Sequence, residues 1–290
     1  MMEARIDGHT QLFGLFGSPV GHSGSPVMYN YTFARLGINA AYLAFDVQID
    51  QLPAVIQAVR TLNFGGFNVT MPCKTAIAQY LDELSPAAKL IGAVNTVVVK
   101  DGKLIGNNTD GVGFVHNLRE NGVDITGKKI VLLGAGGAAT AIACQAALDG
   151  AAEIAIFNRK DEFFANAEHT VEKITAADLK CKVSVTDLAD DAALKAAIAQ
   201  ADILVNATKV GMKPLDGQSL IKKEYLRPEL VVADTVYNPK ETQMIKDAQE
   251  AGCKAAVGGI GMLLWQGVAA FKLFTGKDMP HEEVFEKFFA

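Results

Sequence analysis

The feature that most constrains the fold is an apolar run that breaks at a glycine cluster, "KIVLLGAGGAA" at 129–139. A leucine- and β-branched stretch ends at Gly134 and alanine-rich helix follows, as in the strand–turn–helix of a dinucleotide-binding βαβ unit. There Gly134 permits the tight turn, Gly136 lets a pyrophosphate approach the backbone, and Ala139 keeps helix and strand close. Glycine-rich turns also serve plain packing, and the run 130–148 is long enough for a membrane span. The glycine break disfavours the span.

Short apolar runs alternate with amphipathic segments along the rest of the chain, the βαβ rhythm of a parallel sheet. Strands are expected at 12–17, 40–47, 66–70, 93–99, 103–108, 129–134, 153–157, 202–206, 230–235 and 254–258. Helices are expected at 26–37, 50–61 and 74–83, from "NTDGVGF" onward, and as two segments after Gly261. The pattern predicts an α/β protein of two domains. The N-terminal, mainly parallel α/β substrate domain covers 1–112 plus 261–290, because the C-terminal helices pack back on it, and a Rossmann domain covers 113–260.

The charge composition indicates which classes of partner the protein can bind. The net charge is −5 over 290 residues, and no Lys/Arg-rich block is present. We therefore expect small-molecule partners, with no nucleic acid and no membrane. The cysteines and histidines show no metal-ligand spacing, so no metal site is predicted. Four widely spaced cysteines without a dense disulfide framework, and an N-terminus without signal-peptide features, favour the cytoplasm.

Two charged residues at expected helix starts are candidates for chemistry. Lys74 opens the expected helix 74–83, where the helix dipole disfavours a cation and favours the neutral amine. That field suits a group that transfers protons. Asp110 opens another helix, where a simple helix cap is the alternative. We predict that Lys74 acts as a base on a substrate alcohol and that Asp110 holds its ammonium.

Two serines flank Gly24 in "GHSGSPVMYN", before Pro26 at the expected first position of a helix. Ser25 can be the N-cap, with Ser23 as a loop residue. Alternatively, both hydroxyls and the helix N-terminus receive a substrate carboxylate. The local sequence leaves both interpretations open.

The end of the strand 153–157 is where an adenosine ribose should be recognised. An acid there is typical of NAD enzymes, whereas an arginine accommodates the 2′-phosphate of NADP. Arg159 favours NADP, and Asp161 favours at least some acceptance of NAD, so dual use is a hypothesis. The alternatives are a solvated charge for Arg159 and the N-cap of the following helix for Asp161.

Short segments spread over nearly the whole chain resemble the motif series of the shikimate dehydrogenases. They are "SGSP" (23–26), "NVTMPCK" (68–74), "GAVNTVV" (92–98), "NTDG" (108–111), "GAGGAA" (134–139), "NR" (158–159), "NATKVGM" (206–212), "VYNP" (236–239) and "GMLLWQG" (261–267). "FNRKDEFF" and "NATKVGMKPL" resemble most the quinate/shikimate dehydrogenase branch, which accepts NAD or NADP.

The resemblance implies reversible NAD(P)-dependent oxidation of the C3 hydroxyl of shikimate to 3-dehydroshikimate, of quinate to 3-dehydroquinate, or of both. It also implies a place in aromatic amino-acid biosynthesis and a monomer or homodimer. Lys74 and Asp110 match the catalytic pair. The positions that match substrate contacts are Ser23 and Ser25 for the carboxylate, Asn68, Thr70, Asn95 and Gln266 for the ring hydroxyls, and Tyr237. Those that match cofactor contacts are Ala135, Gly136, Gly137, Ala138, Asn158, Arg159, Asp161, Lys209, Thr235 and Gly259, of which Lys209 and Gly259 fall, with Tyr237, in motifs on the nicotinamide side.

Two positions depart from the family pattern. Cys73 replaces the aromatic, His or Asn usual before the lysine, and packing is its simplest role. Gly24 replaces a larger residue between the serines and leaves space near the substrate. These departures bear on substrate choice, and the alternatives are an altered, for example amino-substituted, cyclic acid or a non-catalytic dinucleotide-responsive regulator. The sequence does not choose between shikimate and quinate.

Overall fold

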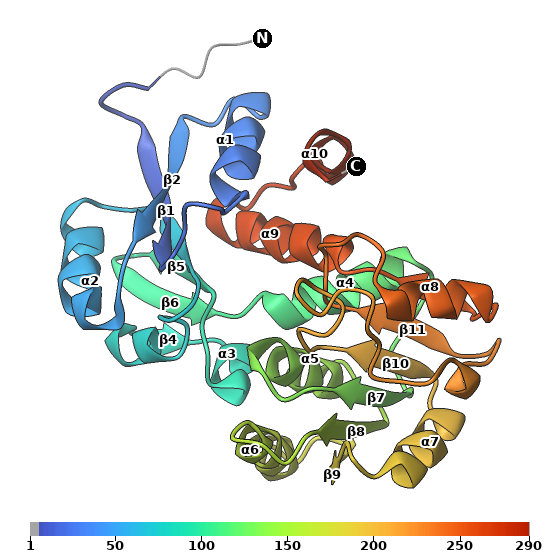
Figure 1. The fold of residues 1–290 in the computed structure, drawn as a ribbon. Helices are drawn as coiled ribbons and strands as arrows, with labels where there is room; N and C mark the ends of the chain where they lie inside the picture. The colour runs from blue at the N-terminus through green and yellow to red at the C-terminus, as the bar shows by residue number, and fades with distance from the viewer. Residues whose placement is uncertain (1–5, 290) are drawn as a thin grey trace. The chain divides into compact units, whose positions relative to one another are not determined.

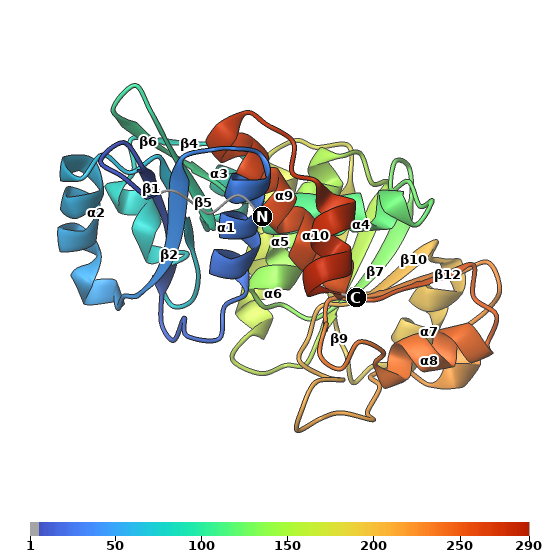
Figure 2. The ribbon, with the colours of Figure 1, turned by 90° about the horizontal axis from the view of Figure 1, so that it is seen from above.

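The computed structural model describes residues 6–289 (Figures 1 and 2), and the chain divides into two compact units. Unit 1 holds the residues up to Thr109 together with those from Gly267 onward, and unit 2 holds Asp110–Gln266. The chain thus passes from unit 1 to unit 2 at Thr109–Asp110 and returns within one helix. The domains predicted above, with boundaries at 112 and 261, stay a proposal.

Unit 2 is built on a fully parallel sheet of six strands in the order β12-β11-β10-β7-β8-β9. The strands are β7 (Lys129–Leu133), β8 (Glu153–Asn158), β9 (Lys182–Asp187), β10 (Ile203–Asn206), β11 (Val231–Asp234) and β12 (Ala255–Val257). Counted from β7 this is the 3-2-1-4-5-6 order of a Rossmann fold, as predicted. The membrane-span interpretation of 130–148 is wrong, because that run is β7, the glycine loop and helix α5.

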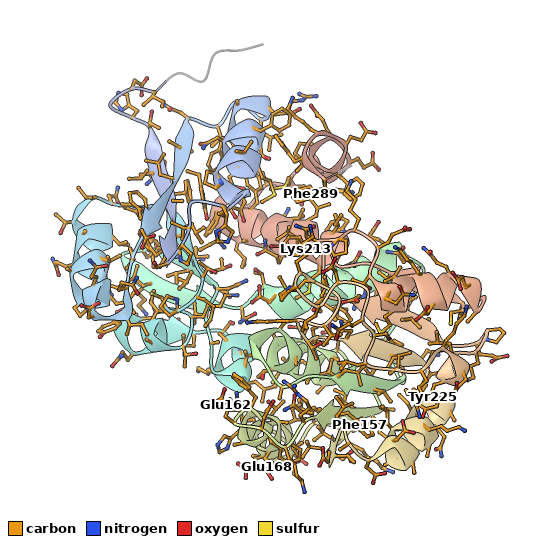
Figure 3. The ribbon with its side chains drawn as sticks, in the orientation of Figure 1. Phe157, Glu162, Glu168, Lys213, Tyr225 and Phe289 are labelled. Carbon is orange, nitrogen blue, oxygen red and sulfur yellow. The ribbon has the colours of Figure 1, made fainter. Side chains whose placement is uncertain are left out.

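Helices cover both faces of this sheet: α5 and α6 on one, α7 and α8 on the other (Figures 1 and 2). The helices of unit 2 are α4 (Asp110–Glu120), α5 (Gly137–Leu148), α6 (Phe164–Ala176), α7 (Asp191–Gln200) and α8 (Gln243–Glu250), with the 3₁₀ turn η3 (Lys223–Tyr225). Phe157 and Tyr225, labelled in Figure 3, lie in the core beneath α7 and α8. Burial on both faces explains why the central strands read as continuous apolar runs.

Unit 1 is built on a mixed sheet in the order β2-β1-β3-β5-β6-β4. The strands are β1 (Gln11–Gly17), β2 (Ala40–Asp46), β3 (Gly66–Val69), β4 (Glu83–Leu84), β5 (Thr96–Lys100) and β6 (Lys103–Asn107). β1 pairs in parallel with β2 and β3, whereas β5 is antiparallel to β3 and β6. The predicted Asp-Gly hairpin is confirmed: Asp101 and Gly102 both have positive φ, which a type I′ turn requires.

The helices of unit 1 confirm the predicted return of the C-terminal segment. They are α1 (Ser25–Arg35), η1 (Ile49–Gln51), α2 (Leu52–Thr61), η2 (Ala76–Tyr80), α3 (Pro86–Ile91), the last part of α9 (Ile260–Thr275) and α10 (His281–Phe288). Phe271 of α9 packs on Phe33 of α1 with ring centroids 5.6 Å apart, and Glu283 of α10 accepts a hydrogen bond from Tyr31. The helix expected at 74–83 is wrong, because only the 3₁₀ segment η2 forms there.

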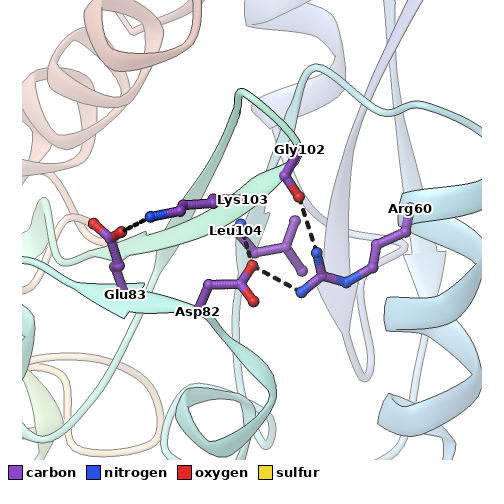
Figure 4. Close-up of polar contacts among 6 residues, drawn as sticks. All are labelled: Arg60, Asp82, Glu83, Gly102, Lys103 and Leu104. Carbon is purple, nitrogen blue, oxygen red and sulfur yellow. Dashed lines mark hydrogen bonds and ion pairs between the residues drawn. The ribbon is translucent and has the colours of Figure 1, made fainter.

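A polar cluster fixes the β4–β6 edge of unit 1 (Figure 4). Arg60 of α2 donates to a carboxylate oxygen of Asp82 at 2.8 Å and to the carbonyl of the hairpin turn, and Asp82 accepts the Leu104 N–H at 2.7 Å. That backbone bond, followed by the Arg60 bond, lowers the pKa of Asp82. Lys103 and Glu83 pair across the same edge at 2.6 Å. The cluster ties α2 to the hairpin whose second strand leads to Thr109.

Candidate active site

The carboxyl ends of β1 and β3 meet at one edge of unit 1. A Cβ atom on Gly17, the last residue of β1, would lie 2.4 Å from the side chain of Thr70, directly after β3, and its φ of +155° suits glycine alone. The segment after β1 carries Ser23 and Ser25, and the segment after β3 carries Thr70 and Lys74. The fold thus gathers these predicted substrate residues at the edge where parallel strands present binding groups.

Asn68 and Asn95, both predicted to bind ring hydroxyls, lie in a buried hydrogen-bond network. The Asn68 amide nitrogen donates to the Asn95 carbonyl at 3.1 Å and to Thr96 Oγ1 at 3.0 Å, while its oxygen accepts the Tyr42 hydroxyl at 2.8 Å. Thr109 donates its N–H to Asn95 Oδ1 at 2.8 Å. Both donors of Asn68 are therefore used, and its remaining capacity is that of an acceptor.

Sequence reasoning did not name Tyr42, Thr96 or Thr109 in this network. Each threonine adjoins a predicted residue in the sequence: Thr96 follows Asn95, and Thr109 precedes Asp110. Tyr42 gave no such signal, because its partner lies 26 residues away on β3.

Lys74 is half-buried in a turn that spans residues 71–75, so its predicted place at a helix start is wrong. η2 begins at Ala76 and is a single short 3₁₀ segment, which has too few aligned peptides to supply the helix field invoked above. Instead, the Lys74 carbonyl accepts the Val94 N–H at 2.8 Å, which holds Lys74 beside the strand that begins after Asn95.

Cys73 lies in the hydrophobic core of unit 1 and is fully buried. Its Sγ is 3.4 Å from the Val47 carbonyl, and burial raises the pKa of the thiol. The structure therefore supports packing as the role of Cys73.

The serine loop begins α1 one residue earlier than expected. α1 starts at Ser25, and its N-cap is Gly24, so the interpretation of Ser25 as the N-cap is wrong. Ser23 Oγ accepts the Ser25 N–H at 3.2 Å and thereby occupies one N-terminal amide. A Cβ atom on Gly24 would have no atom within 4 Å, so this exposed position has room for a larger side chain.

In unit 2, the glycine loop joins β7 to α5 as predicted. Gly134 has a φ of +115°, and a Cβ atom there would lie 2.8 Å from the Ala207 carbonyl, so both conformation and space require glycine. Gly136 is the N-cap of α5 and makes no side-chain cap bond. Gly136 and Gly137 are exposed, and Cβ atoms on them would meet nothing within 4 Å. The N-terminus of α5 is thus open to an anion such as a pyrophosphate.

The predicted ribose residues form a tight turn after β8. Asn158, the last residue of β8, donates to the Arg159 carbonyl at 2.8 Å and to Asp161 Oδ1 at 3.3 Å. Asp161 Oδ1 also accepts the Phe163 N–H at 3.0 Å. α6 begins at Phe164 with Phe163 at its N-cap, so the N-cap interpretation of Asp161 is wrong and an Asx turn takes its place. Arg159, exposed by 79%, pairs with Asp161 Oδ2 at 3.3 Å.

The remaining predicted cofactor residues and Tyr237 lie beyond the ends of neighbouring strands. Lys209 follows β10, and Thr235 and Tyr237 follow β11, so all three extend from the carboxyl ends of parallel strands. Lys209 and Tyr237 are exposed, whereas Thr235 is half-buried. A Cβ atom on Gly259 would lie 2.4 Å from the Thr235 carbonyl, so glycine is required where the chain enters α9.

Asp110 and Gln266 both lie in unit 2, on α4 and on the first part of α9, and these two helices are in contact. Asp110 is the first residue of α4, as predicted. One turn later, Gly113 packs so closely on α9 that a Cβ atom would lie 2.5 Å from the Gln266 backbone nitrogen. The Gln266 amide donates to the Leu263 carbonyl at 3.0 Å, which supplies a partner for this half-buried group.

Among residues 6–289, no group of three or more His, Cys, Asp or Glu side chains is placed to hold a metal ion. Within the same range, no helix is long and apolar enough to cross a membrane. All four cysteines are free.

Comparison with known proteins gives a consistent result. Residues 15–97 match the family model of the shikimate dehydrogenase substrate binding domain, and residues 259–287 match that of the shikimate 5′-dehydrogenase C-terminal domain. A shikimate dehydrogenase (NADP⁺) of Streptococcus uberis is 56% identical, over 96% of this chain and 95% of the relative. A quinate/shikimate dehydrogenase of Escherichia coli is 50% identical, over 94% and 95%. The crystal structure of a Listeria monocytogenes shikimate 5-dehydrogenase in complex with shikimate and NAD superposes with a TM-score of 0.96 at 52% identity, over 98% of each chain.

Proposed function

This chain belongs to the shikimate dehydrogenase family, and we propose that it catalyses the reversible NAD(P)-dependent oxidation of the C3 hydroxyl of shikimate to 3-dehydroshikimate, and of quinate to 3-dehydroquinate. It is an oxidoreductase that acts on a CH–OH group, rather than a non-catalytic regulator.

The observation that carries the proposal is the fit of the glycine loop to a dinucleotide. The exposed Gly136 and Gly137 leave the N-terminus of α5 without a side-chain cap, at the carboxyl end of the central strand of a Rossmann sheet. Backbone N–H groups and the helix dipole favour a pyrophosphate there. A loop that served packing alone would fill this space with side chains.

In the proposed mechanism, Lys74 takes the proton of the substrate alcohol during oxidation and returns it during reduction, and Asp110 assists this transfer. Ser23 and Ser25 bind the carboxylate. The nicotinamide ring, when bound, supplies the hydride acceptor or donor. Asn68 accepts a hydrogen bond from a ring hydroxyl, because both of its own donors are already used.

Dual cofactor use is supported by the pair of opposite charges after β8. The exposed Arg159 guanidinium suits the 2′-phosphate of NADP. Asp161 lies 3.3 Å from that guanidinium, partly offsets its charge, and supplies an acceptor for a ribose hydroxyl of NAD. We propose that the two residues together permit both cofactors.

Acceptance of quinate is supported by the open space at Gly24. Quinate carries a hydroxyl on the tetrahedral carbon that bears its carboxylate, whereas the corresponding carbon of shikimate is planar. Beside the carboxylate-binding serines, the absent side chain leaves room for this added group.

The test is initial rates of nicotinamide reduction, followed by absorbance, with shikimate and quinate each offered against NAD and NADP. Lys74→Ala should lower turnover by about 10² to 10⁴-fold with little change in the Michaelis constant for the acid. Lys103→Ala is the matched control, because Lys103 pairs with Glu83 on an exposed edge of the same unit.

Unchanged turnover with a raised Michaelis constant would make Lys74 a binding group. If the wild-type enzyme shows no activity with any combination of acid and cofactor, the proposed substrates are overturned in favour of an altered cyclic acid.

A further inference from the structure

Two loops carry Lys209 and Tyr237, which the sequence resemblance places on the nicotinamide side, and this inference rests on the proposed function. Lys209 lies in the loop after β10, and Thr235 and Tyr237 lie in the loop after β11. All three are half-buried or exposed, so core packing alone does not fix their positions.

A buried carboxylate, Asp234, joins the two loops. Asp234 is the last residue of β11 and is 1% exposed. Its Oδ1 accepts the side-chain N–H of Asn206, the last residue of β10, at 2.9 Å and the backbone N–H of Val236 at 2.9 Å. Its Oδ2 accepts the hydroxyl of Thr242, the N-cap of α8, at 2.6 Å. One carboxylate therefore links the ends of two strands to the start of a helix.

Asn206 extends the link into the loop after β10. Its side-chain nitrogen also donates to the Val210 carbonyl at 3.0 Å, and its oxygen accepts the N–H and the hydroxyl of Thr208 at 3.1 and 2.7 Å. Lys209 is held between these two residues.

The loop after β10 also packs tightly on Thr242. Gly211 has a φ of +103°, and a Cβ atom there would lie 3.0 Å from Thr242 Cγ2. The Thr242 side chain is therefore fixed from two sides, its hydroxyl by Asp234 and its methyl group by the packed glycine.

The chemistry of the network explains why a carboxyl group stands at position 234. Burial raises the pKa of Asp234, and the hydrogen bonds from Thr242, Val236 and Asn206 oppose that shift. Two oxygens that accept in different directions can serve three donors on three segments at once. An apolar residue of the same size would leave those donors unsatisfied.

We propose that Asp234 is a positioning residue for hydride transfer: it fixes the two loops that present Lys209 and Tyr237 to the nicotinamide half of the cofactor. It has no such role for the adenosine half, which is assigned to Asn158–Asp161 at the end of β8. In the sheet, β8 is separated from β11 by β10 and β7.

Asp234→Ala tests the proposal, with Asp234→Asn as the conservative control. Asn retains the oxygen that accepts from Asn206 and Val236, and its amide can donate to the Thr242 hydroxyl. We expect kcat to fall about 10 to 100-fold in Asp234→Ala, the effect of misplacing a reacting group by about 1 Å. It should stay within about threefold of wild type in Asp234→Asn. The affinity for adenosine 2′,5′-bisphosphate, measured by calorimetry, should stay within about twofold in both variants.

Hydrogen exchange provides a readout that does not require turnover. In Asp234→Ala, residues 207–213 and 235–241 should exchange faster, whereas the β8 turn at 158–163 should keep its protection. If Asp234→Ala does not fold, Thr242→Val removes one of the three donors to Asp234, and Thr242→Ser keeps that donor. Thr242→Val should then show a smaller fall in kcat and a smaller increase in exchange of the two loops, and Thr242→Ser should resemble the wild type.

Normal kcat in a folded Asp234→Ala protein of lower stability would overturn the proposal and leave a purely structural role. Equal loss of adenosine bisphosphate affinity or equal deprotection of the β8 turn would also overturn it, since the effect would then extend over all of unit 2. If the wild-type enzyme turns over no substrate, the proposed function fails, and the exchange pattern still decides whether Asp234 orders the two loops.

Discussion

The hydroxyl of Tyr42 allows a direct test of the buried hydrogen-bond network around Asn68. Tyr42 is fully buried, and its hydroxyl donates to Asn68 Oδ1 at 2.8 Å. Tyr42→Phe preserves the ring and leaves that buried oxygen without its donor, a loss of about 1–3 kcal/mol in the free energy of unfolding. The substitution should also raise the Michaelis constant for the acid, because Asn68 loses one of the three hydrogen bonds that orient its amide.

Burial of Tyr42 also predicts how the free energy of unfolding changes at alkaline pH. Burial raises the pKa of Tyr42, and of Tyr29 beside it, above the ordinary value of about 10. A raised folded-state pKa means that the stabilisation is complete below about pH 10 and is lost as pH rises further, by about 1.4 kcal/mol per pH unit and group. Tyr42→Phe removes one of these groups. The variant should be less stable at neutral pH, and its deficit should shrink above about pH 10.

The assay is urea unfolding followed by circular dichroism from neutral pH to about pH 11. Tyr225→Phe is the matched control, because the Tyr225 hydroxyl donates at 2.6 Å to Asp191, whose carboxylate is exposed. We expect a smaller change there at neutral pH. Wild-type stability of Tyr42→Phe at neutral pH, or a deficit that does not narrow on the alkaline side, would refute the reasoning.

Three further predictions concern the cofactor and the acid. Asp161→Asn keeps the Asx turn and removes the negative charge near Arg159. The Michaelis constant should therefore rise for NAD and fall for NADP, each by up to about fivefold, as for the loss of an exposed ion pair. Equal shifts of the two Michaelis constants in steady-state rates would contradict this. Gly134→Ala should destabilise unit 2 by at least about 1–3 kcal/mol in thermal unfolding, whereas Gly136→Ala should fold normally and raise the Michaelis constant for both cofactors, and the reverse order would show that the loop is misassigned. Gly24→Val should leave the melting temperature unchanged and lower the quinate-to-shikimate ratio of kcat/KM, and an unchanged ratio would remove Gly24 from substrate choice.

The parts of the fold that follow from local chemistry were predictable. The glycine loop, the Asp-Gly hairpin and the central buried strands each have a signal within a few residues. β9 was missed because Lys182–Asp187 is a half-exposed edge strand with polar residues at alternate positions, and a short periodic run of that kind is easily read as loop. The helix expected after Lys74 was wrong because apolar spacing over ten residues does not distinguish an α-helix from a 3₁₀ segment that ends in an extended residue.

The positions of the candidate site were predictable from the sequence, but the hydrogen bonds that each residue makes there were not. Motif matching names Asn68, yet only the fold shows that Tyr42 occupies its oxygen and that both of its donors are used. Motif matching also includes Asn206 but gives no reason to single out Asp234, because the hydrogen bond between these two side chains joins positions 28 residues apart. Such contacts depend on which strands become neighbours, and that is decided by tertiary pairing.

The two units use the same device at their sites. In unit 1, Asn95 accepts the Thr109 N–H one residue before Asp110, and in unit 2, Asp234 accepts the Val236 N–H one residue before Tyr237. In each case a buried side chain at or beside a strand terminus holds the backbone next to a proposed functional residue. Positioning of this kind uses side chains that need not touch a ligand, since their partners are backbone and buried polar groups. Substitution of Asp234, which is not among the predicted ligand contacts, should therefore affect turnover in a folded enzyme more than it affects ligand affinity. Loss of the direct contact proposed between Ser23 and the carboxylate should do the opposite.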